Sequence, residues 1–431
     1  MEPGRQESTK KHGFNLITAL CFSVSPWFFN PRLRVVERTN FSNMKKQTLF
    51  FTSLLKILLI LISAGSISWY HNNDGTKPIE NNPIIKLQVE DVFKRNYIKA
   101  TMMKVTGWQL KNPNHAPTDW TNGAFYAGVV AAYNTLKSKL IYDSLMALGE
   151  RTGWSPGRRY DHADDIAISQ TYIDLYRIKK DKNMIQATID TVQKMRTIPG
   201  REVAQHGITW WWCDALFMAP PTLVKLGVTL KDPTYFSLND SLFKQTVDLL
   251  YSKEEHLFAR DANYLINEQG EGKREANGKK IFWSRGNGWV MGGLVRLLEE
   301  LPKSNQSRDY YINIYRQMAE KVMSLQQEDG LWRASLLDPA SYPGGEGSGS
   351  GFFCYALAWG INKGILSKEK YLPVVKKAWQ GLNTLVSPEG RVGWVQPIGG
   401  DPKRNFSAES WEVYGAGAFL LAGSEVIKVK W

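Results

Sequence analysis

The chain has 431 residues, enough for one large domain or for two or three smaller ones. Its composition is globular, with 43% hydrophobic and 22% charged residues, and its 16 tryptophans suit sugar faces as well as a core. Residues 1–64 hold nine Lys or Arg against three Asp or Glu, so they carry +6 of the net charge of +13, and the remaining +7 forms no dominant basic block. This distribution argues against a nucleic-acid partner and fits an anionic small substrate or simple solubility.

The N-terminal segment has the pattern of a secretory signal peptide. The stretch "MKKQTLFFTSLLKILLILISAGS" begins at Met44 with two lysines, continues through apolar residues and ends in small ones. Lys56 interrupts it, and it is short for a membrane-spanning helix. We expect a non-native or disordered extension over 1–43, a signal peptide over 44–66, a linker over 67–90 and the folded domain over 91–431. The protein would be exported, and periplasmic, or membrane-anchored if the signal is retained.

The chain lacks the usual sequence signatures of metal, nucleotide and serine-hydrolase sites. Its three cysteines, Cys21, Cys213 and Cys354, are too few and too scattered for a disulfide framework or a CxxC site. Cys213 and Cys354 lie in apolar stretches and are expected to be buried. HxxxH, HExxH, Walker and GxSxG motifs are absent. We therefore expect no metal and no cofactor.

From residue 90 onward, segments rich in glycine, alanine and aromatic residues recur. Six such segments start near residues 122, 164, 213, 285, 348 and 412, for example "NGAFYAGVVAAY" and "EVYGAGAFLLAGSEVI". Amphipathic stretches such as "NMIQATIDTVQKMRTI" and "YLPVVKKAWQGLNTLV" lie between them, with apolar residues at helical spacing. This alternation of buried and half-exposed helices predicts an all-α fold, an (α/α)6 barrel. The spacing of the segments is too irregular for the alternative, an α-solenoid.

Motifs that could carry chemistry come just before the inner helices. "YDHADD", "HGITWWWCD", "FWSRGNGW" and "YPGGEGSGSG" precede the second to fifth of them. If the ring closes, these segments gather at one end and line a common pocket.

Asp214 is the strongest candidate for an acid. It follows Trp210, Trp211 and Trp212, and partial desolvation beside indole rings raises a carboxyl pKa toward the range of a general acid. Asp161, Asp164 and Asp165 in "YDHADD" are the other carboxylates of interest. Helix capping alone is an equally open explanation for Asp164 and Asp214.

Further side chains are candidates for substrate contacts. Arg285, between two tryptophans in "FWSRGNGW", could form a fork with a substrate carboxylate while an indole stacks on a sugar ring. Arg260 could add a polar contact, although a surface ion pair with Asp261 is the simpler explanation. The predicted substrate-binding residues are Asp165, His162, Trp211, Trp283, Arg285, Asn287, Arg260 and Trp120.

Several of these motifs, in order and in register, resemble one known family. "HADDIAISQTYIDLY", "WWWCDALFMAPPTLVKLG", "FWSRGNGWVMGGLVRLLEELP", "DGLW" and "SGSGFFCYALAWGINKG" are similar to the unsaturated rhamnogalacturonyl hydrolases of glycoside hydrolase family 105, relatives of the unsaturated glucuronyl hydrolases of family 88. The likeness runs from about residue 95 to the end. It implies an (α/α)6 barrel acting on small oligosaccharides left by polysaccharide lyases.

The resemblance also implies roles for two aspartates. Asp214, in "WCDALFM", matches the family's acid/base, which protonates the enol ether at C4 while water adds at C5; the resulting hemiketal rearranges and releases the sugar. Asp164, or Asp165 if the register slips by one, would hold the water or the sugar hydroxyls. Some members have a histidine where Arg260 stands here, which puts any contact of that histidine in doubt. Arginine cannot act as a base at neutral pH.

The expected function is removal of the terminal 4,5-unsaturated uronic acid, with a rhamnogalacturonan disaccharide as the family's default substrate. The alternatives are an unsaturated glucuronyl hydrolase of glycosaminoglycan or ulvan oligosaccharides, a non-catalytic sugar-binding barrel, and a lyase or endo-acting glycosidase on the same fold. No stable membrane contact is expected after signal cleavage. The oligomeric state stays open.

Overall fold

The computed structural model describes residues 91–431. The predicted extension (1–43), signal peptide (44–66) and linker (67–90) lie outside the described residues. Within the described part, no helix has the length and apolar character that crossing a membrane requires. Within residues 91–431, six inner helices alternate with six outer ones. The inner set is α4 (Trp120–Leu136), α6 (Ser169–Lys179), α10 (Pro220–Leu230), α12 (Ser284–Glu300), α14 (Gly347–Asn362) and α16 (Val413–Val426). The outer set is α3 (Arg95–Lys111), α5 (Lys139–Thr152), α7 (Asn183–Thr197), α11 (Thr234–Leu250), α13 (Arg308–Ser324) and α15 (Lys368–Thr384).

Short elements connect these helices. They are η2 (Ala163–Ile166), α8 (Arg201–His206), α9 (Ala215–Met218), η3 (Ala262–Tyr264), η4 (Pro339–Ser341) and the antiparallel strands β1 (Tyr251–Ser252) and β2 (Leu257–Phe258). In the strand pair, Tyr251 lies opposite Phe258.

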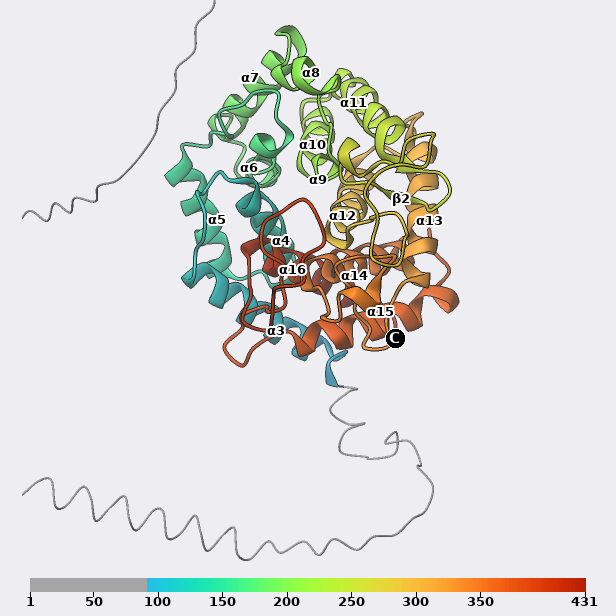
Figure 1. Ribbon diagram of the computed structural model, residues 1–431. Helices are drawn as coiled ribbons and strands as arrows, with labels where there is room; N and C mark the ends of the chain where they lie inside the picture. The colour runs from blue at the N-terminus through green and yellow to red at the C-terminus, as the bar shows by residue number, and fades with distance from the viewer. Residues whose placement is uncertain (1–90) are drawn as a thin grey trace, which may run out of the picture. The chain divides into compact units, whose positions relative to one another are not determined.

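The inner helices form a closed ring. Each packs on the next, in the order α4, α6, α10, α12, α14 and α16, and α16 packs back on α4. Figure 1 shows these helices around the centre and the outer set outside them. This closure confirms the predicted (α/α)6 barrel, because the two ends of a solenoid would not meet.

The sequence pattern explains which helices lie inside. In α16, every residue from Val413 to Val426 is buried. The outer helix α7 buries only Met184, Ile185, Thr188 and Val192, which lie on one face. Cys213 and Cys354 are buried, as expected from their apolar surroundings.

Glycines set the close approach of neighbouring inner helices. A Cβ atom added to Gly128 of α4 would lie 2.4 Å from the carbonyl oxygen of Gly417 in α16, and one added to Gly417 would lie 2.6 Å from the oxygen of Ala124. Backbone atoms cannot swing away as a side chain can. The α4–α16 contact that closes the ring therefore requires glycine at both positions.

We expect Gly128→Ala to destabilise the protein by about 1–3 kcal/mol, because the extra methyl group overpacks the core. Gly107→Ala in α3 is the matched control, since no atom lies within 4 Å of a Cβ placed there. It should stabilise by about 0.5–1 kcal/mol through helix propensity alone. Denaturant unfolding measures both; equal effects at the two sites would contradict the close-contact explanation.

Candidate active site

The starts of the inner helices meet at one end of the ring. Trp120, at the start of α4, stacks on Tyr414 of α16 with ring centroids 5.5 Å apart. A cavity of about 680 Å³ opens at this end. Its walls include Trp120, Asp119, Asp164, Asp165 and the segment 155–159.

Asp214 is held in a dry environment; it does not line this cavity, but its charge acts on Asp164, which does. Its residue exposure is 9%, and it precedes α9 without making a capping hydrogen bond, so capping does not explain it. The thiol of Cys213 donates to Oδ1 of Asp214 at 3.3 Å. Burial raises the pKa of Asp214 above its usual range, while the charges of Arg260 and Arg285 oppose that rise.

Asp164 is the second carboxyl of the site, and it is half-buried. It lies inside η2, whose N-cap is His162, so its carboxylate is not the cap. Its side chain is 18% exposed. Burial first, and then the charge of Asp214, raise the pKa of Asp164 to about 8. Asp164 therefore keeps its proton at neutral pH, in part because of the like charge of Asp214.

Such a pair can both deliver and receive a proton. The protonated member can protonate a reacting atom, and the resulting carboxylate can then take a proton from water. Neither the donation of the proton nor its uptake from water needs a titrating group besides the two carboxyls. The sequence analysis predicted a desolvated position for Asp214, and the burial of this residue agrees with that prediction.

Asp165, which sequence analysis left open as the second carboxylate, is tied up in an ion pair. Its oxygens accept from the Arg159 backbone N at 2.7 Å and from Arg159 Nε at 2.9 Å. The pair fixes the loop that carries Asp164. Of the two neighbours, Asp164 has the carboxylate without an arginine partner, since its ion-pair contact is His162 Nδ1 at 3.7 Å; Asp165 also lines the cavity.

His162 positions Asp164. Its Nδ1 accepts from the Asp164 backbone N at 3.3 Å, which leaves the proton of a neutral ring on Nε2, and the ring packs on Trp212 with centroids 4.5 Å apart. Burial, and the charge of Arg159, lower the pKa of His162, so the ring is neutral at pH 7.

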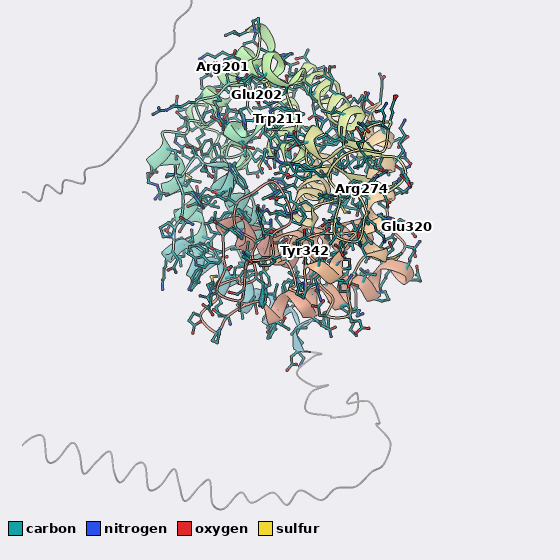
Figure 2. All side chains as sticks on the ribbon, in the orientation of Figure 1. Arg201, Glu202, Trp211, Arg274, Glu320 and Tyr342 are labelled. Carbon is teal, nitrogen blue, oxygen red and sulfur yellow. The ribbon has the colours of Figure 1, made fainter. Side chains whose placement is uncertain are left out.

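Trp211 lies between two parts of the site. Its Nε1 donates to Glu202 of α8 at 2.6 Å, and His206 stacks on its ring at 4.0 Å. Figure 2 shows Glu202 and Trp211 on the α8 side of the ring. The guanidinium of Arg260 lies 5.5 Å from the centroid of Trp211. Trp211 is half-buried, so part of its ring is accessible, as a sugar contact requires.

Arg260 lies where the family resemblance suggested a histidine. Its Nη1 pairs with Asp261 Oδ2 at 2.5 Å, and its carbonyl oxygen accepts from the Cys213 backbone N at 2.9 Å. The segment after β2 is therefore tied directly to the segment that carries Asp214. The positive charge of Arg260 favours the ionised form of Asp214.

The expected role of Arg285 needs correction. The side chain is fully buried, and its guanidinium lies between the rings of Trp283 and Tyr414, at 4.4 and 4.7 Å from their centroids. Nη1 donates to the Gln396 carbonyl oxygen at 2.5 Å and Nη2 donates to that of Pro397 at 3.0 Å. Arg285 therefore holds the loop between α15 and α16, and its fork is not available to a substrate carboxylate.

Trp283 and Asn287 also lie behind the site instead of in it. Trp283 is 2% exposed, so its ring cannot stack on a sugar. Asn287 is fully buried; its Oδ1 accepts from the Phe258 backbone N at 2.8 Å and its Nδ2 donates to the Phe258 oxygen at 3.1 Å. It fixes β2 against α12. Their polar and aromatic character, which suggested substrate contact, serves packing.

Sequence analysis missed several residues around the site. Asp119 caps α4 by accepting from the Thr121 backbone N at 2.9 Å, and its charge adds to the rise in the pKa of Asp164. Glu202 anchors Trp211. Asp161, noted only as a carboxylate, accepts backbone N–H groups of Arg201 and Glu202 and so fixes α8. Nothing in the local sequence of Glu202 distinguishes it from a surface residue.

Residues 91–431 contain no group of three or more His, Cys, Asp or Glu arranged to hold a metal ion. The polar groups of the candidate site are carboxyl, guanidinium, imidazole and indole. Their chemistry is proton transfer and binding of polar, anionic or ring-shaped ligands.

Comparisons with known proteins agree with this geometry. A family model described as Glycosyl Hydrolase Family 88 matches residues 94–430. The unsaturated 3S-rhamnoglycuronyl hydrolase of Formosa agariphila is 42% identical over 357 residues, which cover 80% of this chain and 94% of that protein.

Two solved structures share the fold over their whole length. A polysaccharide lyase is 32% identical with a TM-score of 0.71, covering 77% of this chain and 97% of that one. A glycosyl hydrolase family 88 protein from Bacteroides vulgatus is 29% identical with a TM-score of 0.72, covering 78% of this chain and 100% of that one. The motifs that resembled families 105 and 88, the closed helical ring and the match over residues 94–430 lead to one conclusion: the chain belongs to glycosyl hydrolase family 88.

Proposed function

We propose that this protein is an exo-acting hydrolase that removes a terminal 4,5-unsaturated uronic acid from small oligosaccharides. The observation that carries the proposal is the pair of desolvated carboxyls: Asp164, on the wall of the cavity at the open end of the ring, and Asp214, whose charge acts on it. A sugar-binding barrel would need no such proton store. Family membership and the name of the Formosa relative support the same activity.

The proposed reaction uses a proton held by Asp214, whose pKa is raised by burial. Asp214 delivers it to C4 of the enol ether, and positive charge develops at C5 and the ring oxygen. Water held by Asp164 adds at C5 and returns a proton to the carboxylate. The hemiketal then opens to a ketone at C5, and the hemiacetal left at C1 releases the neighbouring sugar. One water is consumed, and the carboxyl pair ends as it began.

We propose that the sugar next to the unsaturated uronide is a rhamnose. The Formosa protein is named for a 3S-rhamnoglycuronyl substrate, and it is 42% identical to this chain. The expected rhamnogalacturonan disaccharide is one example of such an unsaturated uronide–rhamnose unit. An oligosaccharide with a hexosamine in place of rhamnose represents the glucuronyl alternative.

The test is the ultraviolet absorbance of the conjugated enol ether. Purified protein should abolish this band with an unsaturated rhamnoglycuronyl disaccharide, with release of rhamnose. Persistence of the band with both the rhamnose- and the hexosamine-linked disaccharides would exclude both hydrolase activities and leave the sugar-binding and lyase alternatives.

A lyase is the second candidate, because a solved structure 32% identical to this chain is named a polysaccharide lyase. The two activities change the same band in opposite directions. A lyase creates the double bond, so absorbance would rise with intact polysaccharide, whereas the proposed hydrolase consumes it in the cleaved product.

We further propose that the protein works outside the cytoplasm, in the periplasm. The signal-like stretch that begins at Met44 supports this. Cell fractionation of the full chain and of a chain lacking residues 44–66 tests it; equal distribution of the two would contradict export.

A further inference from the structure

A second cavity lies beside the candidate active site. It measures about 400 Å³ and is lined by Arg158, Arg159, Tyr160, Asp161, Arg201, Glu202 and Gln205. Arg158 and Arg159 also line the larger cavity that contains Asp164. The two cavities therefore share a wall, and a ligand at Asp164 that extends past this wall reaches the second cavity.

The acidic groups of the second cavity are already satisfied by the protein. Asp161 accepts from the backbone N–H groups of Arg201 and Glu202, and Glu202 accepts from Trp211 Nε1 at 2.6 Å. Arg159 is held by Asp165, with Nε 2.9 Å from Oδ1. These carboxylates are committed to fixing loops.

Two guanidinium groups remain. Among the described residues, the side chains of Arg158 and Arg201 have no hydrogen-bond, ion-pair or ring partner, and both are exposed. Arg158 lies in the loop before η2 and Arg201 begins α8, so they come from neighbouring loops at the active end of the ring. Figure 2 shows Arg201 beside Glu202, on the same side as Trp211. Guanidinium groups present paired N–H donors that match a compact oxyanion.

We propose that Arg158 and Arg201 form a subsite for an anionic substituent, a sulfate ester or a carboxylate, on the sugar that follows the unsaturated uronide. This inference rests on the proposed function. A uronide ring that reaches Asp164 lies in the larger cavity, and the proposal places the next sugar toward the wall that Arg158 and Arg159 share with the second cavity. There its anionic group meets the two unpaired arginines. Charge-assisted hydrogen bonds of this kind stabilise the bound sugar and select against an uncharged one.

The test compares an unsaturated disaccharide whose second sugar is sulfated with its desulfated and its carboxylated counterparts. In the variant Arg158→Gln/Arg201→Gln, the ratio of kcat/KM for the sulfated over the desulfated substrate should fall at least about tenfold, mainly through KM. The carboxylated arm shows whether the subsite accepts either oxyanion. Arg316→Gln on α13 is the control, because it removes the same charge from an exposed arginine of an outer helix.

Equal losses on the sulfated and desulfated substrates would overturn the proposal, since they would assign the arginines to the uronide's own carboxylate. No loss on either substrate would also overturn it. Calorimetric binding of the same disaccharides to Asp214→Asn, with and without the two arginine changes, gives a readout independent of turnover. If the wild type turns over neither substrate but still binds the sulfated one through these arginines, the proposed function fails while the subsite stands.

Discussion

Replacement of Asp214 by asparagine is expected to lower kcat on the unsaturated disaccharide by about 10³-fold or more. Asparagine keeps the shape of the side chain but has no proton to deliver to C4. The rate of loss of the enol-ether absorbance, measured for wild type and variant at the same pH, checks this. Because the change falls on the transfer of a proton, kcat should fall much more than KM rises.

The control is Asp309→Asn, which makes the same chemical change at an exposed position in the first turn of α13. It should retain full activity. Binding of the disaccharide to Asp214→Asn by calorimetry separates loss of chemistry from loss of the fold. Full activity of Asp214→Asn would mean that another group donates the proton.

Replacement of Asp164 by asparagine is expected to lower activity and, at pH 8, to raise stability. In the folded protein this carboxyl keeps its proton up to a pKa of about 8, whereas its ordinary value is 3.8. Between pH 4 and pH 8 the unfolded chain loses that proton and the folded chain does not. The folded state binds more protons, so its stability falls as pH rises through this window.

The asparagine variant does not titrate and avoids this loss. We expect it to be more stable than wild type by about 1–3 kcal/mol at pH 8, and nearly equal near pH 4. The gain is less than the full pKa shift implies, because the amide must still be buried in the same place. Denaturant unfolding at the two pH values measures it.

The substitution Asp214→Asn tests the coupling of the two carboxyls. The negative charge of Asp214 is one cause of the raised pKa of Asp164, so Asp164 should lose its proton at a lower pH in this variant, and the fall of stability with rising pH should end at a lower pH than in the wild type. An unmoved end of this pH window would show that the two groups titrate independently. A site that is destabilising when intact is the expected trade-off between activity and stability.

The fold could be predicted from the sequence because helix burial is visible in composition. The segment "EVYGAGAFLLAGSEVI" has no polar face, so it could only lie inside, and α16 is buried throughout. The stretch "NMIQATIDTVQKMRTI" has one apolar face, and α7 lies outside. Such patterns depend on residues three or four apart, which the chain itself brings together.

The candidate site could be predicted only in part. Asp214 stood out because its neighbours in sequence, the tryptophans, are also its neighbours in space. Arg285 and Asn287 were misjudged because their partners, Gln396 and Phe258, are 111 and 29 residues away. The sequence alone does not distinguish a buried arginine that holds a loop from an exposed arginine that binds a substrate.

The sequence by itself determined the alternation of inner and outer helices, the ring that they form and the desolvated aspartate at residue 214. Only the tertiary structure distinguishes Asp164 from Asp165, because Arg159 pairs with Asp165 while the charge of Asp214 acts on Asp164. It also decided which arginines are free for a ligand. Local order fixes which residues are apolar together, whereas ion pairs, pKa shifts and cavities arise between segments that meet only when the ring closes.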